Sequence, residues 1–185
     1  MFLKNAESIQ PRLPSREEIC ALWEKFGMLP NIRRHSRQVC RVALTICQWL
    51  EAAGFHFNKA MIEAGALLHD VAKAYCLDKP DLRHSLEGQR IMEQAGYPEL
   101  GELVAKHVNL PDTGSLDEAV IVFYADKRVV GEKVVSVAER FQYIQRVYGQ
   151  DNPERLERIK RDELLTYEVE KRLFKLLPSV SPQDL

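Results

Sequence analysis

Six residues with metal-binding side chains are spread along this chain of 185 residues. Four of the five histidines belong to the series, one of them is directly followed by an aspartate, and a later aspartate closes it. In chain order the members are His35, His69, Asp70, His84, His107 and Asp126. Imidazole and carboxylate groups bind zinc, iron and manganese, and six of them are enough for two ions. The series therefore predicts a shared metal site with hydrolytic or redox chemistry.

The neighbours of these residues predict that they face the protein interior. Residues 60–76 contain few strongly polar side chains, so this stretch is predicted to be a helix that is buried on most sides and carries the His-Asp pair. His35 and Asp126 have apolar residues at helical spacing on either side of them in the sequence. His84 and His107 likewise lie on apolar helix faces. A single inward-facing histidine is more often a hydrogen-bonded core residue than a metal ligand. Four such histidines together with two inward-facing aspartates, however, favour a shared metal site. His56 is predicted to be structural or exposed.

Start and stop signals divide the chain into helices. Capping boxes begin at Ser15 and Ser136, Asn58 and Ser115 are further caps, and Pro98 and Pro153 stand where helices can begin. The helices expected from these signals span 15–26, 31–53, 58–76, 84–96, 98–107, 115–126, 136–149 and 153–177. No stretch alternates at period two for long enough to predict a sheet, although residues 120–124 have a strand-like composition. The sequence predicts an all-α chain.

Length and composition fit one compact domain over residues 1–185, with a helical core at 31–149 and flanking helices at 15–26 and 153–177. A formal net charge of −1 provides no general attraction to nucleic acid or to anionic lipid. The four cysteines form no Cys-x-x-Cys pair, and no apolar run reaches the length of a membrane helix. The chain is therefore expected in the cytoplasm, with buried thiols and no membrane partner.

The order His, His-Asp, Asp on the helices of an all-α domain resembles the HD-domain superfamily of metal-dependent phosphohydrolases. The resemblance covers residues 31–149, and LLHDVAK with the later YADK is its most specific part. The additional histidines, His84 and His107, resemble the dinuclear branch of that superfamily. Within that branch, HDVAK and HSLEG are similar to bacterial HD-domain hydrolases that split dinucleoside polyphosphates at a two-iron centre. The residues after Asp126, Lys127-Arg128-Val129, depart from the pattern of those hydrolases.

The resemblance implies roles for individual residues. His35, His69, Asp70 and Asp126 would hold one metal ion, and Asp70 would bridge to a second ion bound by His84 and His107. We expect two divalent ions, with iron or manganese as the first candidates and zinc, magnesium, nickel and cobalt as the others. Two such ions would acidify a bridging water and polarise phosphoryl oxygens.

Catalytic roles are predicted for Asp70 and Lys73, and substrate-binding roles for other basic residues close to the ligands. Lys73 lies three residues after Asp70, so helical spacing places its ammonium near the metal, either to stabilise charge in the transition state or to pair with a core carboxylate. Arg34, Arg37 and Lys127 are candidates for contacts with substrate phosphate. For the two arginines the alternative is an ordinary solvated helix face.

Three functions remain open at this level. The first is a dinuclear-metal phosphohydrolase that acts on a nucleotide or related phosphate ester or anhydride. The second is an oxygenase, because some HD-domain proteins with the same ligand order activate dioxygen at a mixed-valence di-iron centre. The third is a catalytically silent regulator that binds nucleotides. The expected partner is a small phosphorylated molecule and not a nucleic-acid polymer, and the sequence leaves open whether the chain forms a homodimer.

Overall fold

The computed structural model describes residues 11–79, 82–108, 110, 115–149 and 152–185. Within these residues the fold consists of helices and one short hairpin, which confirms the all-α prediction. The helices are α1 (Arg16–Lys25), α2 (Pro30–Ala52), α3 (Lys59–Leu68), α4 (His84–Gln94), α5 (Pro98–Lys106), α6 (Glu118–Asp126), α7 (Val137–Tyr148) and α8 (Pro153–Lys175), with a 3-10 turn at Pro182–Asp184. The hairpin pairs β1 (Val129–Val130) with β2 (Lys133–Val134).

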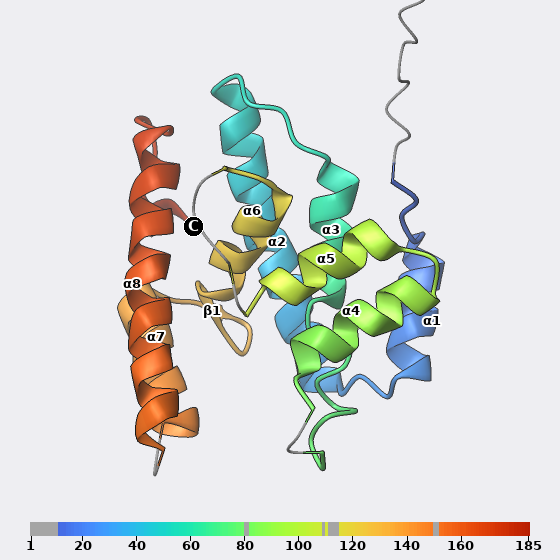
Figure 1. Cartoon of the computed structure of the whole chain (residues 1–185). Coiled ribbons are helices and arrows are strands. Elements are labelled where there is room, and N and C mark those ends of the chain that lie inside the picture. Colours follow the sequence, from blue (N-terminus) through green and yellow to red (C-terminus); the bar gives the residue numbers. More distant parts are fainter. Residues whose placement is uncertain (1–10, 80–81, 109, 111–114, 150–151) are drawn as a thin grey trace, which may run out of the picture.

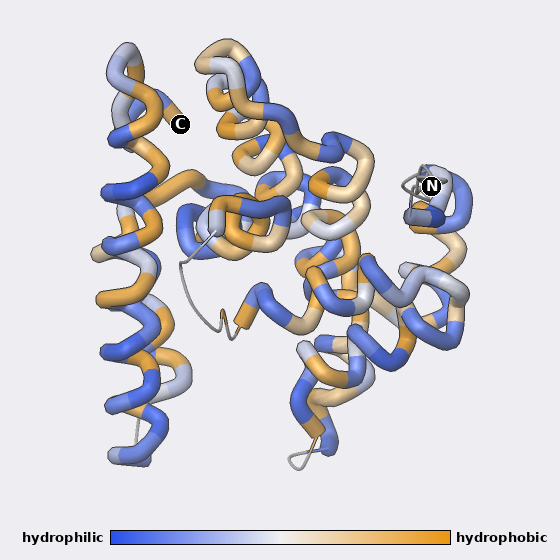
Figure 2. The backbone as a smooth tube through the Cα atoms, turned by 45° about the horizontal axis from the view of Figure 1, so that its top comes forward, coloured by the Kyte–Doolittle hydropathy of each residue, from blue (hydrophilic) through white to orange (hydrophobic). Residues whose placement is uncertain are grey.

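The core lies where α2, α3 and α6 pack together. Figure 1 shows these helices between α1 on one side of the molecule and α8 on the other. Every residue of α6 after its first is buried, although its strand-like composition could suggest a sheet. Hydrophobic and hydrophilic segments alternate along α8 in Figure 2, because this amphipathic helix buries one face and exposes the other. None of the helices in the described ranges is long and apolar enough to span a bilayer.

Helix starts largely follow the signals in the sequence. The capping boxes at Ser15 and Ser136 are both formed, and Asn58 accepts a hydrogen bond from the Met61 amide. The N-cap of α6 is Asp117 and not Ser115, because the Asp117 carboxylate reaches the Val120 amide. The sequence also predicts a turn from Pro111 to Gly114, and these residues lie outside the described part of the chain.

The prediction of one helix over residues 60–76 is wrong, because α3 ends at Leu68. A series of tight turns follows, in which the Val71 amide donates to the Leu68 carbonyl and the Lys73 amide donates to the Asp70 carbonyl. His69 caps the end of the helix, with its Nδ1 2.7 Å from the Ala66 carbonyl oxygen. The His-Asp pair therefore lies at a helix end, where the two side chains are not restricted to one helical face.

Helices α4 and α5 form an antiparallel pair that is packed closely through glycine. A Cβ atom added at Gly88 would lie 2.7 Å from Val104 Cγ1, and one added at Gly101 would lie 3.0 Å from the Gln89 carbonyl oxygen. Val104 is branched at Cβ, so it cannot swing away as a longer side chain could. This packing holds His84, at the start of α4, opposite His107, at the end of α5.

We expect Gly88→Ala to lower the free energy of unfolding by about 1 to 3 kcal/mol, because the added methyl group overpacks the contact with Val104. Thermal unfolding followed by circular dichroism measures the change. Leu86→Ala is the control on the same helix, since its side chain is half exposed. Equal stability of Gly88→Ala and the unmodified protein would show that the two helices can separate without cost.

Candidate metal centre

The structure brings all six predicted ligand residues into one buried cluster. Their imidazole rings form a continuous row, with centroid distances of 5.5 Å from His35 to His69, 5.0 Å from His69 to His107 and 5.2 Å from His107 to His84. Two groups of residues could each hold a metal ion, because the ligand atoms within a group all lie within 4.8 Å of one another. His35, His69 and Asp70 form the first group, and Asp70, His84 and His107 form the second. The cluster can therefore bind metal.

Asp70 belongs to both groups, and its two oxygens face different histidines. Oδ1 lies 3.5 Å from His84 Nε2 and 3.6 Å from His107 Nε2. Oδ2 lies 3.5 Å from His69 Nε2 and accepts a hydrogen bond of 2.8 Å from the Lys73 ammonium. One carboxylate thus stands between two sets of imidazole nitrogens.

Asp126 lies beside the first group. Its Oδ1 lies 3.0 Å from His35 Nε2 and 3.7 Å from His69 Nε2. Its Oδ2 accepts a hydrogen bond of 2.8 Å from the Lys127 ammonium, which also donates to the His107 carbonyl at 2.9 Å. Lys127, a sequence candidate for substrate contact, is buried and holds a ligand candidate in place.

Backbone carbonyls fix the orientation of three of the four rings. The Nδ1 atoms of His69, His107 and His35 lie 2.7 Å from the Ala66 oxygen, 2.5 Å from the Val104 oxygen and 3.1 Å from the Gly131 oxygen. A ring that donates its Nδ1 proton to a carbonyl is left with a lone pair on Nε2, the arrangement usual for metal-binding histidines. The carbonyl that holds His35 comes from the β1–β2 turn, where Gly131 adopts a φ of 60°.

The polar atoms of the cluster fit a bound cation. His69 Nε2 is fully buried and has no hydrogen-bond partner in the described part of the chain. Since Nδ1 already faces a carbonyl, a neutral His69 would direct the Nε2 lone pair toward the carboxylates of Asp70 and Asp126. A bound cation would offset the repulsion between these groups and would satisfy the buried nitrogen. The donor set of imidazole and carboxylate suits zinc, iron or manganese.

The electrostatics of the cluster keep its carboxylates ionised and two of its imidazoles neutral. Burial alone would raise the pKa of Asp70, but Lys73 and His69 hold that pKa well below its usual range. Burial would likewise raise the pKa of Asp126, but Lys127 and Arg140 hold it well below the usual range.

The histidine pKa values shift in both directions. Burial lowers the pKa of His84 to about 4 and also lowers the pKa of His107, so both imidazoles are uncharged and able to bind metal at neutral pH. Burial acts against protonation of His69, but the pKa of His69 is raised because Asp70 and Asp126 favour a positive charge there. A bound metal ion would supply positive charge in the same way.

The cluster is reached from the side of His84 and Lys73. Their side chains are 32% and 34% exposed, whereas the His69 side chain is completely buried. Lys73 is thus the basic residue that combines contact with a ligand candidate and access to solvent. Its position agrees with either role that the sequence allowed.

The two sequence candidates on α2 lie differently. Arg34 is half exposed and pairs with Glu132 in the β1–β2 turn at 2.7 Å. Arg37 lies over the ring of Trp23, on the side of α2 that faces α1. No contact among the described residues joins Arg37 to the cluster.

Sequence reasoning missed one residue of the cluster. Arg140 of α7 has a side chain that is 11% exposed, and its Nη2 donates to Asp126 Oδ1 at 3.2 Å. The signal was present, because Arg140 lies at helical spacing with Val137, Phe141 and Ile144 on the apolar stripe of its helix. A guanidinium on a buried stripe requires a partner.

The family model of the HD domain matches residues 32–129. The chain belongs to the HD domain family. The match includes all six predicted ligand residues, and the HD domain is typical of a superfamily of metal-dependent phosphohydrolases. The HD domain ends at the β1–β2 hairpin by this match, so Arg140 lies beyond it. Neither the comparison with curated proteins nor that with solved structures found a significant match.

Proposed function

We propose that this HD-domain chain is a dinuclear-metal phosphohydrolase that hydrolyses a phosphate ester or anhydride of a nucleotide or related compound. The observation that carries the proposal is the position of Asp70, whose oxygens face two different sets of imidazole nitrogens. His35, His69, Asp70 and Asp126 would hold one ion, and Asp70, His84 and His107 the other. A pair of divalent ions bound there would supply an acidified water and polarise a phosphoryl oxygen.

The basic residues around the site support an anionic substrate. The Lys73 ammonium is partly exposed at the accessible side and lies 2.8 Å from Asp70 Oδ2, so it can approach a phosphoryl group that enters there. Lys127 and Arg140 hold Asp126 in place from two sides, which fixes one ligand candidate before substrate binds. Iron and manganese are the first candidates for the ions, since both accept mixed imidazole and carboxylate ligands.

The test combines elemental analysis with an anaerobic assay of phosphate release. Protein purified without chelators is analysed for bound metal and is then incubated without dioxygen with nucleoside polyphosphates, dinucleoside polyphosphates and phosphodiesters. We expect release of phosphate or nucleotide. This activity should be lost when a chelator removes the metal and should return when the native kind of divalent metal is added back. His56→Ala is the histidine control, because His56 is exposed and lies outside the cluster.

Two outcomes would contradict the proposal. Turnover that requires both iron and dioxygen would favour a mixed-valence di-iron oxygenase, which uses the same kinds of ligand. Two bound metals and nucleotide affinity without turnover across the whole substrate panel would favour a regulator that binds and does not hydrolyse.

A further inference from the structure

The side chain of Arg140 reaches the metal centre from outside the matched HD domain. Arg140 lies on α7, packed beside α8, whereas the residues of the centre come from the segment 32–129. Its guanidinium donates to Asp126 Oδ1, the oxygen that also lies 3.0 Å from His35 Nε2. The guanidinium is therefore at the edge of the first ligand group.

Only half of the guanidinium edge that faces Asp126 is used. Nε and Nη2 form one edge of the planar group, with N–H bonds that point in the same direction. Arg16 and Arg90 use this edge fully, because Nε and Nη2 of each share one glutamate oxygen. In Arg140 the Nη2 atom donates to Asp126, but Nε is buried with no hydrogen-bond partner among the described residues.

The Asp126 carboxylate leaves the second donor of Arg140, Nε, without a hydrogen bond. A carboxylate can accept both N–H groups of such an edge, one on each oxygen. The second oxygen of Asp126, however, is bound by the Lys127 ammonium at 2.8 Å, and Lys127 is fixed in turn by the His107 carbonyl. Arg140 Nε is buried without a hydrogen-bond partner among the described residues, so its N–H is free for an acceptor from another group.

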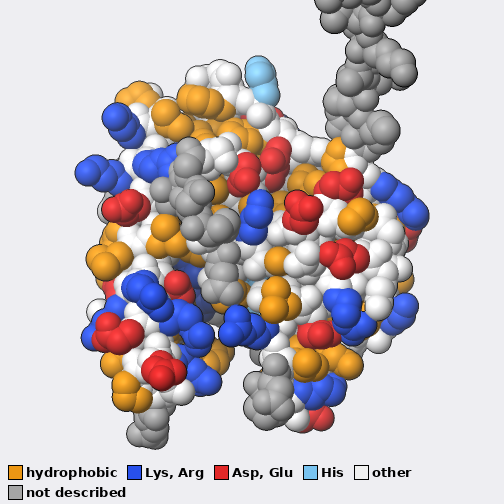
Figure 3. Space-filling view, in the orientation of Figure 1, with side chains coloured by type: hydrophobic (Ala, Val, Ile, Leu, Met, Phe, Trp, Pro, Cys, Tyr) orange, Lys and Arg blue, Asp and Glu red, His pale blue; other side chains and the backbone are white. Residues whose placement is uncertain are grey.

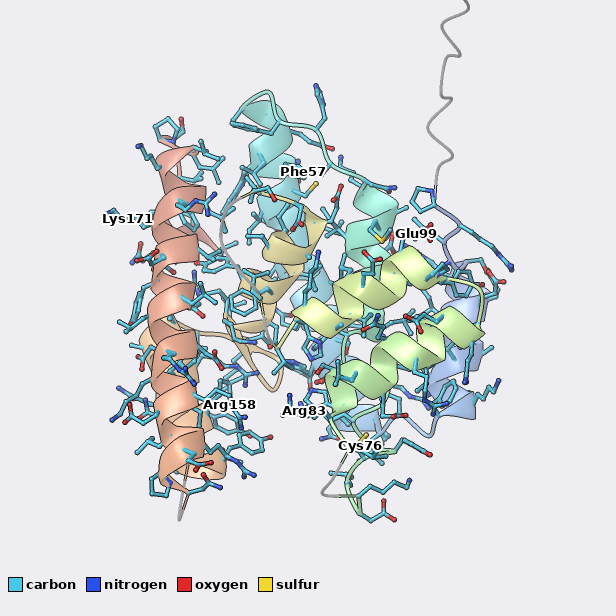
Figure 4. All side chains as sticks on the ribbon, in the orientation of Figure 1. Phe57, Cys76, Arg83, Glu99, Arg158 and Lys171 are labelled. Carbon is cyan, nitrogen blue, oxygen red and sulfur yellow. The ribbon has the colours of Figure 1, made fainter. Side chains whose placement is uncertain are left out.

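The surroundings favour an anionic acceptor. Figure 3 shows Lys and Arg side chains on both sides of the hollow between α8 and α4, and Figure 4 places Arg158 of α8 and Arg83, just before α4, at its two sides. Burial raises the pKa of Asp162 on α8, whereas Lys127 and Arg158 act to lower it, so this part of α8 lies within electrostatic range of Lys127. An oxygen of a phosphoryl group is an acceptor of the matching charge.

We propose that Arg140 is a substrate-binding residue whose Nε–H donates to a phosphoryl oxygen while its Nη2 continues to hold Asp126. The inference rests on the proposed phosphohydrolase function and adds a contact from α7 to it. Helix α7 then has two roles: it packs the core through Val137 and Phe141 and supplies the guanidinium that selects a phosphorylated ligand.

The test measures the binding of inorganic phosphate to the metal-loaded protein by titration calorimetry. Arg140→Lys keeps the positive charge and can still reach Asp126, but it lacks the paired donors. We expect this variant to retain its metal ions and to bind phosphate about ten- to a hundredfold more weakly, the loss of one charged hydrogen bond. Arg146→Lys is the matched control, because Arg146 is exposed on the same helix, and its phosphate affinity is expected to stay unchanged.

Arg140→Gln is a second variant. Metal content and thermal unfolding are recorded for Arg140→Lys and for Arg140→Gln, so that if one variant does not fold, the other still tests the inference. Unchanged phosphate affinity with full metal content in either folded variant would overturn the inference. Loss of metal in both would also overturn it, because Arg140 would then act only by positioning Asp126. If the unmodified, metal-loaded protein neither binds phosphate nor hydrolyses phosphate esters, the proposed function fails together with the inference. If it hydrolyses phosphate esters and both Arg140 variants bind phosphate as tightly as it does, only the inference is rejected.

Discussion

Asp70→Ala is expected to lose both metal ions and, with them, hydrolytic activity. Asp70 is the only residue that both potential ligand groups of the described chain share. Without its carboxylate, four imidazoles and Asp126 remain, and the Lys73 ammonium is left without its partner beside the site. We expect activity to fall by more than about a hundredfold, since removal of a group that only supports a metal ligand already costs up to that much. Elemental analysis and the phosphate-release assay measure the two losses.

Asp78→Ala is the matched control, because the Asp78 side chain is exposed in the turns that follow Asp70. Two ions retained in Asp70→Ala would contradict the bridging role. Single histidine variants refine the result: His84→Ala is expected to retain about one ion per chain, since only the second group loses a ligand. Loss of both ions from His84→Ala would instead show that the two positions fill together.

The sequence predicted which residues form the cluster because their inward positions follow from helical periodicity. Apolar neighbours at three and four residues place His35 and Asp126 toward the core, and both are buried. The same reasoning failed for the geometry around Asp70, where the assumed helix has ended and turns direct the side chain. The contact from Lys73 to Asp70 forms nevertheless, because residues three apart are also close in consecutive turns.

Contacts that depend on tertiary pairing were beyond the reach of the sequence. The carbonyl that orients His35 comes from Gly131, 96 residues later, in a hairpin of only two pairs. Arg140 contacts Asp126 from α7, which follows that hairpin in the chain. Arg34 contacts the β1–β2 turn, whereas Arg37 contacts Trp23 of α1. The closeness of Arg37 to His35 in the sequence therefore did not predict which residues it contacts.

Arg128→Ala is expected to lower the free energy of unfolding by about 3 to 5 kcal/mol, as is typical when one partner of a buried ion pair is removed. The Arg128 side chain is 5% exposed and pairs with Glu170 of α8 at 3.5 Å. Its guanidinium also donates to the Tyr124 hydroxyl and to the carbonyls of Val135 and Pro182. The substitution leaves these acceptors without their donor and places a cavity between α6 and α8. Denaturant unfolding measures the change.

Arg146→Ala is the control for this variant, since substitution of an exposed residue on α7 is expected to change stability by less than about 0.5 kcal/mol. Arg128 follows Asp126 and Lys127 directly, and its hydrogen bonds attach the end of α6 to the chain leading into α7, which carries Arg140. Loss of Arg128 should therefore loosen the relation between Asp126 and Arg140, and metal affinity should fall even where Arg128→Ala is still folded. A folded variant with unchanged metal affinity would show that Arg128 does not contribute to the position of Asp126.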